Sequence, residues 1–209
     1  MTDQTLSMSF TSGTLLYHES LIVAGLHAEL GAWEAVRQVV VAENRLQMRT
    51  LNASKRICRE VISRLRLLTP QALDLLRTGT QIEQNLLLWL AVCKRYGYIY
   101  QFATEVLREK FVQLDFLLSH DDYEIFFNRK AEWYPEVERV ASSTQRKQRQ
   151  VLFKMLREAG LLDEQGRILP ALLTPRLATL IQADDVAFLK IYPVTDQDMR
   201  KWADSYARS

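Results

Sequence analysis

The sequence predicts a mainly α-helical protein. Apolar residues recur at helical spacing through most of the chain, whereas the alternation typical of β-strands is scarce. Only 7 Gly and 5 Pro occur in 209 residues, so few positions break a helix. Because 48% of the residues are hydrophobic, the chain can fill the core of one large domain or two small ones.

Residues 1–78 are predicted to form an N-terminal helical module. Gly31 separates its first two helices, since glycine readily takes the positive φ that ends a helix. Asn52 or Ser54 is expected to cap the third helix, and Thr69 precedes Pro70 at the start of the fourth. The predicted helices are Leu15–Leu30, Ala32 to about Leu46, Leu51–Leu68 and a helix from Pro70.

Residues 79–209 are predicted to form a C-terminal helical module, which begins at a short linker around Gly79. Gln81 to Tyr96 is apolar on nearly every side, which indicates a central helix of a bundle. Further helices are expected from Tyr98 to about Leu118, from Asp121 to about Trp133, from Pro135, from Thr174–Pro175 and, capped by Thr195, at the C-terminus.

A winged helix-turn-helix is expected inside this second module. A short helix from Pro135 is followed by a turn at Ser142 to Thr144 and then by a long basic helix. The segment LLDEQGRILP, with a turn at Gly166, then predicts a small β-hairpin. The order of helix, turn, basic helix and hairpin is that of the winged motif.

The basic helix separates its charge from its apolar face. At 100° per residue, Val151, Leu152, Met155 and Leu156 share one arc. The other arc carries five polar side chains: Arg146, Lys147, Gln150, Lys154 and Arg157. A solvated helix face would be a simple explanation, but such faces usually intersperse Glu, and none occurs here before Glu158. This unrelieved charge predicts an anionic partner, of which phosphate is the obvious kind.

A second helix repeats this design. Ile57, Val61, Leu65 and Leu68 form its apolar side, while Lys55, Arg56, Arg59 and Arg66 lie on the other. The two helices align at a constant offset, which either duplication or shared amphipathic design explains. Arg167 on the expected hairpin is placed to reach an adjacent phosphate, and Gln145, Gln148 and Gln150 carry groups that can contact base edges.

No chemical motif points to catalysis, to a cofactor or to a metal. The chain has no glycine-rich phosphate loop and no nucleophile beside a base, and His18 and His27 lie too far apart for a helical zinc pair. Cys58 and Cys93 are expected to be buried small hydrophobes. The longest apolar run, Leu86 to Cys93, is too short to span a membrane, and the N-terminus does not read as a secretory signal, so a cytoplasmic location is expected.

Several segments together resemble the BrxA family of BREX bacteriophage-defence systems. They are Ser9–Ser20, the pattern W-x-x-V-x-x-x-x-x-x-E-N-x-L-Q-x-R from Trp33 to Arg49, SKRICREVISRL, VLREKF, and STQRKQRQVLFKMLREAGLL. The resemblance covers roughly Ser9 to Pro193. It implies a helical protein with a part similar to the NusB fold, and DNA binding in support of host methylation and phage exclusion. The family has no established catalytic motif, and its older description as a membrane protein conflicts with the short apolar runs here.

The function that we expect is therefore binding of double-stranded DNA by a non-enzymatic accessory protein of a phage-defence system, together with other BREX components. Contacts would be mainly to phosphates. Two alternatives remain at this point: a scaffold whose basic faces dock acidic protein surfaces, and RNA binding by analogy with NusB.

Overall fold

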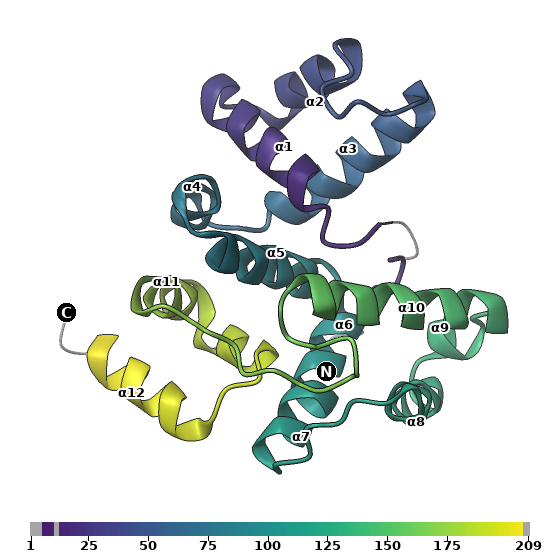
Figure 1. The fold of residues 1–209 in the computed structure, drawn as a ribbon. Coiled ribbons are helices and arrows are strands. Elements are labelled where there is room, and N and C mark those ends of the chain that lie inside the picture. The colour runs from purple at the N-terminus through teal and green to yellow at the C-terminus, as the bar shows by residue number, and fades with distance from the viewer. Residues whose placement is uncertain (1–5, 11–12, 207–209) are drawn as a thin grey trace.

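Helix α5, Gln81–Arg95, lies at the centre of the molecule (Figure 1), as its apolar surface predicts. The computed structural model describes residues 6–10 and 13–206. Trp89 is fully buried on α5, and its indole nitrogen donates to the carbonyl oxygen of Ile191 at 3.1 Å. The Tyr192 hydroxyl donates to the carbonyl oxygen of Leu86 at 2.9 Å. The C-terminal part of the chain is thus tied to the central helix by hydrogen bonds that burial shields from water.

Helices α1 (Tyr17–Leu30), α2 (Trp33–Ala42) and α3 (Leu51–Leu65) pack together on one side of α5 (Figure 1). Gly31 ends α1 with φ of 73°, which confirms its predicted role. Helix α2 ends at Ala42, four residues before the predicted end. Thr50, rather than Asn52 or Ser54, caps α3, because its Oγ1 accepts from the Ala53 amide at 3.1 Å.

Helix α4, Pro70–Thr78, turns directly into α5 at Gly79. Thr69 caps α4 as predicted, with Oγ1 accepting from the Ala72 amide at 3.2 Å. Thr80 and Glu83 form a reciprocal capping box at the start of α5. The buried cluster of apolar side chains is continuous from residues before Gly79 to residues after it.

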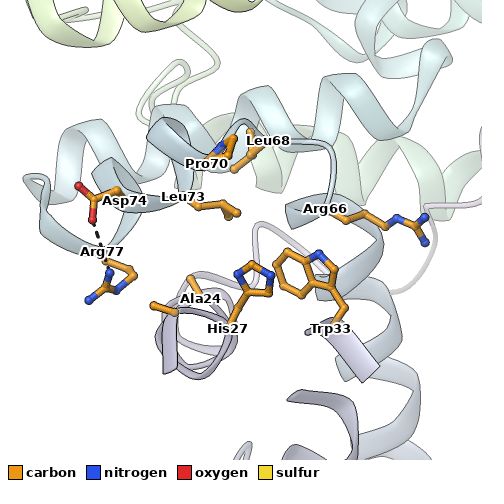
Figure 2. Close-up of a pocket in the computed structure, with 10 residues that line it drawn as sticks. Ala24, His27, Trp33, Arg66, Leu68, Pro70, Leu73, Asp74 and Arg77 are labelled. Carbon is orange, nitrogen blue, oxygen red and sulfur yellow. Dashed lines mark hydrogen bonds and ion pairs between the residues drawn. The ribbon is translucent and has the colours of Figure 1, made fainter. Parts of the chain in front are cut away.

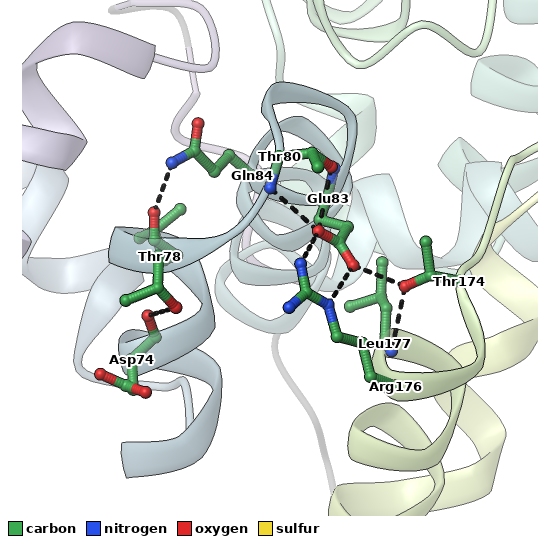
Figure 3. A network of polar contacts seen from close by, with 9 residues as sticks. Asp74, Thr78, Thr80, Glu83, Gln84, Thr174, Arg176 and Leu177 are labelled. Atoms are coloured by element: carbon green, nitrogen blue, oxygen red, sulfur yellow. Dashed lines mark hydrogen bonds and ion pairs between the residues drawn. The ribbon is translucent and has the colours of Figure 1, made fainter.

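Glu83 also joins this corner to helix α11, Pro175–Asp185 (Figure 3). Its side chain is fully buried and accepts from Arg176 Nε and from Thr174 Oγ1, each at 2.6 Å. The Arg176 guanidinium, with the hydroxyls and amide of the two threonines, holds the pKa of Glu83 far below its ordinary value. One carboxylate therefore both starts α5 and fixes α11 against it.

The helix predicted from Tyr98 to about Leu118 is divided and ends early. It consists of α6 (Gly97–Phe102), a π-helical turn (Ala103–Leu107) and α7 (Arg108–Val112). Leu114 takes a positive φ of 63°, a conformation that cannot continue a right-handed helix. Helix α8, His120–Ala131, follows, and Ser119 with Asp122 caps it in place of the predicted Asp121.

Helix α10, Ser142–Glu158, follows the short α9, Pro135–Glu138. The predicted turn at Ser142 to Thr144 is wrong, because these residues form the first turn of α10, and Ala141 takes the extended conformation before it. A long regular helix thus carries the whole basic run.

The predicted β-hairpin and winged helix-turn-helix are not formed in the described residues. Residues 161–169 make a tight turn closed by an isolated bridge between Leu162 and Ile168, and a second bridge joins Leu117 to Arg167. The Asp163 carboxylate stabilises the turn by accepting hydrogen bonds from the backbone amides of Gln165 and Arg167. Pro170 has no amide with which to extend the pairing, so the bridges do not grow into strands.

The described part of the chain ends with α11, the 3₁₀ segment Val186–Ile191 and α12, Asp196–Tyr206. Helix α11 begins at the predicted Thr174–Pro175, where Thr174 Oγ1 accepts from Leu177 N at 3.4 Å. Thr195 caps α12 as predicted, with Oγ1 accepting from Asp198 N at 3.1 Å. Among the described residues, no helix combines the length and apolarity needed to cross a lipid bilayer. Every regular element of residues 6–10 and 13–206 is helical, which confirms the predicted class.

Candidate nucleic-acid interface

Helix α10 presents its basic arc to solvent. Val151, Leu152, Met155 and Leu156 are buried, as their spacing predicts. Arg146, Lys147, Gln150 and Lys154 are exposed, and Arg157 is partly buried with 31% of its side chain exposed. Arg157 lies eleven positions after Arg146, so the cations extend over about 16 Å of helix.

Intramolecular ion pairs neutralise this arc only weakly. Lys154 lies 3.8 Å from Glu158, and Arg157 Nε lies 3.6 Å from a Glu164 that is itself 84% exposed. Arg146 and Lys147 have no ion pair with any described residue. Exposed pairs at these distances contribute roughly 0.2–1 kcal/mol each, so a phosphate can displace them at small cost.

Three other polar side chains of α10 serve the fold instead. Gln148 is buried and donates to the carbonyl oxygen of Met8 at 2.7 Å. Gln145 and Arg149 both bind the carboxylate of Glu124 on α8. Gln148 is therefore not available to bases, so the prediction is wrong for that residue. Gln145 is half-buried against Glu124, and Gln150 is the exposed one of the three glutamines.

A hollow of about 470 Å³ adjoins the C-terminal half of the basic arc. Its lining includes Gln150, Lys154 and Arg157 from α10, together with His120 and Glu164. Phe153 closes the inner side, buried against the His120 ring with centroids 5.0 Å apart. The sequence did not point to His120 or Glu164, because the bridge that brings their segments together joins Leu117 to Arg167, about fifty positions apart.

Arg167 is exposed at the edge of the tight turn after α10. Gly166 before it has φ of 81°, and a Cβ there would lie 3.0 Å from the carbonyl oxygen of Leu118. Glycine therefore permits the close approach that seats this turn on the loop before α8. The turn places Arg167 at the surface even though the predicted hairpin is absent.

Helix α3 presents the second basic face. Lys55, Arg56, Arg59 and Arg66 are exposed, and none has an ion pair with a described residue. Ile57, Val61 and Leu65 are buried on the opposite side, as predicted.

Arg64 of the same helix is instead a structural residue. It is buried, and it donates to Glu60 Oε1 at 2.7 Å and to the Thr14 carbonyl oxygen at 2.6 Å. Glu60 also accepts from the Tyr96 hydroxyl, and burial together with this contact raises the pKa of Tyr96 to about 12. A buried guanidinium needs such partners, whereas the exposed cations of α3 need none.

The N-terminal segment lies between the two basic helices (Figure 1). Thr14 accepts from Arg64 of α3, and the Leu15 amide donates to Glu158 Oε2 of α10 at 2.7 Å. Two neighbouring residues thus link the helices and hold them in a defined relative position.

The two cysteines are buried, as the sequence predicts. Cys58 and Cys93 are free and buried, and burial raises the pKa of both thiols. Within residues 6–10 and 13–206, no three His, Cys, Asp or Glu side chains come together in a way that could hold a metal ion.

Comparison with known proteins identifies the family. The family model described as BrxA matches residues 4–185. The chain belongs to the BrxA family. The resemblance noted in the sequence is therefore confirmed, and it extends over most of the chain.

Two BrxA relatives and one solved structure illustrate the similarity. A "BREX protein BrxA" of Bacillus cereus (strain H3081.97) is 28% identical over 130 residues, which is 62% of this chain and 65% of that protein. The chain thus spans just under two thirds of that relative. A "BREX protein BrxA" of Escherichia coli O9:H4 (strain HS) is 26% identical over 155 residues, 74% of this chain and 73% of that protein. The crystal structure of an uncharacterized protein from Magnetospirillum magneticum shares the fold, with a TM-score of 0.75 at 20% identity over 88% of this chain and 96% of that one.

Proposed function

We propose that this BrxA-family protein is a non-enzymatic, cytoplasmic DNA-binding component of a BREX phage-defence system, acting with other proteins of that system. The printed names of its relatives support the assignment to BREX. The solvent-open basic arc of α10 supports binding to duplex DNA.

One observation carries the DNA-binding proposal: the inner cation of α10 has an acidic partner, whereas two cations of its outer arc have none among the described residues. Arg149, on the inner edge, is held by the Glu124 carboxylate, whereas Arg146 and Lys147, on the outer arc, have no acidic partner among the described residues. Like charges on adjacent turns repel each other, so the arrangement costs free energy unless a polyanion offsets it. Duplex phosphates would supply that polyanion.

The proposed contacts are mainly to the DNA backbone. Arg146, Lys147, Lys154 and Arg157 would contact phosphates, Gln150 lies among them, and Arg167 extends the surface. Lys55, Arg56, Arg59 and Arg66 would contribute a second backbone contact from α3. Backbone contacts of this kind bind without sequence preference and weaken steeply with salt.

The test is charge reversal with a matched control. The triple variant Arg146→Glu, Lys147→Glu, Lys154→Glu should abolish retardation of a duplex in a gel, with its circular dichroism unchanged. The control changes the charge equally at exposed cations of other elements, through Arg37→Glu, Lys190→Glu and Lys201→Glu. This control should bind the duplex nearly as the wild type does.

Equal loss in both variants would mean that net charge alone governs binding and would remove α10 from the site. If duplex RNA competes better than duplex DNA, RNA is the partner. If neither nucleic acid binds while α10 remains folded, the basic faces serve as docking surfaces for acidic proteins instead.

A further inference from the structure

A second hollow, of about 310 Å³, opens between α1 and α4 (Figure 2). Ala24, His27 and Ala28 line it from α1, and they share one helix face because they lie three and four positions apart. Leu73 and Asp74 line it from the facing side of α4. The volume lies within the range of small-ligand sites, which are mostly apolar with a few polar groups.

An aromatic pair and an aliphatic cluster line opposite sides of this hollow, which we call the slot. On one side, the His27 ring stacks on the Trp33 indole, with centroids 3.7 Å apart and planes 20° apart. Burial lowers the pKa of His27, which favours the uncharged ring. Leu68, Pro70 and Leu73 form the opposite wall (Figure 2). An aromatic side that faces an aliphatic side suits a planar ring.

Polar groups stand at the two ends of the slot. Arg66 lies beyond Trp33 at one end, and Asp74 with Arg77 lies at the other, where Arg77 Nη1 donates to Asp74 Oδ1 at 3.4 Å (Figure 2). Asp74 and Arg77 are both well exposed, so their contact is easily exchanged for one with a ligand. The slot therefore offers a cation, an acceptor and a donor around an apolar middle.

Arg66 connects the slot to the basic face of α3. It lies on the same arc as Lys55 and Arg59, at the C-terminal end of the helix. A nucleic-acid strand whose phosphates follow these cations would reach the mouth of the slot at Arg66.

We infer that this slot binds a nucleobase, packed between the His27–Trp33 pair and the aliphatic wall of α4, with its phosphate on Arg66. The Asp74 carboxylate accepts from an exocyclic amino group, so adenine, cytosine and guanine fit better than thymine or uracil. The base comes from a free nucleotide or from an unpaired position of a strand. Duplex binding by α10 is not needed for this site.

Trp33 provides the readout. Nucleoside monophosphates, and single-stranded oligonucleotides of one base each, are titrated against the intrinsic fluorescence of the full chain, which has 4 Trp. A base stacked in the slot should quench the emission, and Trp33→Phe should remove this change. AMP, CMP and GMP should quench at lower concentrations than TMP or UMP.

A second variant tests the site by filling the slot while Trp33 is left unchanged. Ala28 is exposed on the wall of the slot, so Ala28→Phe fills the space without deleting a contact. It should weaken base binding by at least about tenfold, since stacking of one base contributes on that order. Ala42→Phe, at another exposed alanine on α2, is the matched control and should bind as the wild type does.

The outcomes separate the sources of the base and the two proposals. A strand that binds at least tenfold tighter than its nucleotide, and loses that advantage in Lys55→Glu, Arg59→Glu, identifies an unpaired base. Equal affinities identify a free nucleotide. Loss of duplex binding in the α10 triple variant with base binding retained supports both the α10 interface and a separate nucleobase site. Absence of quenching by every base, or equal binding by Ala28→Phe and Ala42→Phe, overturns the nucleobase site even where duplex binding persists.

Discussion

The salt dependence of duplex binding should report how many cations of α10 meet phosphates. The arc carries four basic side chains, Arg146, Lys147, Lys154 and Arg157. Each phosphate neutralised contributes about −0.9 to the slope of log affinity against log salt, so four contacts give a slope of about −3.6. Between 50 and 200 mM salt the affinity should then fall about 150-fold.

The same measurement shows whether the two basic faces engage a single duplex. Lys55, Arg56, Arg59 and Arg66 of α3 would bring the slope to about −7 if all eight cations contact phosphates. The assay is fluorescence anisotropy of a labelled duplex, titrated at several salt concentrations. Arg146→Gln with Lys147→Gln should reduce the slope by about 1.8, because two phosphate contacts are lost.

A matched pair of neutralisations decides the role of α3. Lys55→Gln with Arg56→Gln should reduce the slope by the same amount only if α3 meets the duplex that α10 holds. The control, Arg37→Gln with Lys190→Gln, should leave the slope unchanged. The reasoning is refuted if the wild-type slope is near zero, or if the change at Arg146 and Lys147 leaves it unaltered.

Three further predictions concern the framework that holds these faces. Glu83→Gln should lower the free energy of unfolding by about 2–4 kcal/mol in urea titrations, because charge-assisted hydrogen bonds to Arg176 and Thr174 are lost. The folded-state pKa of Glu83 is depressed, so its contribution is present above pH 4.5 and declines as pH falls through the folded value. The variant should therefore lose less stability on acidification, and an equal loss would contradict the assignment. Leu156→Ala should cost about 3–5 kcal/mol by opening a cavity beneath α10, and a change below 1 kcal/mol in thermal unfolding would refute that packing. Thr50→Ala should cost about 1 kcal/mol through loss of the α3 cap, whereas Asn52→Ala should be nearly neutral; the reverse order would contradict the observed cap.

The helices could be predicted because their signals are local. The spacing of apolar residues predicted α5 and α10. Thr69, Thr174 and Thr195 each indicated the start of the helix that follows. The hairpin could not be predicted correctly in the same way. Whether two short arms become strands depends on partners elsewhere in the chain, and here Asp163 and Pro170 limit the pairing to single bridges.

The outer arc of α10 could be predicted because helical period alone fixes which side chains share it. The inner polar residues could not, because their partners lie far away in sequence. Gln148 binds Met8, and Arg149 binds Glu124, across separations of 140 and 25 residues. The slot beside Trp33 was missed for the same reason, since its walls come from separate helices.

Burial explains why a chain of net charge +2 keeps two strongly basic faces. A cation that folding removes from water requires a carboxylate or a carbonyl partner, because an unpaired buried charge is too costly. Glu60 meets that need for Arg64, and Glu124 does so for Arg149. Both carboxylates are occupied by these inner cations, so they do not offset the exposed cations of α3 and α10. The outer arcs of α3 and α10 therefore keep their charge as a consequence of how the inner cations are paired, and the proposed binding to a polyanion would use this exposed charge.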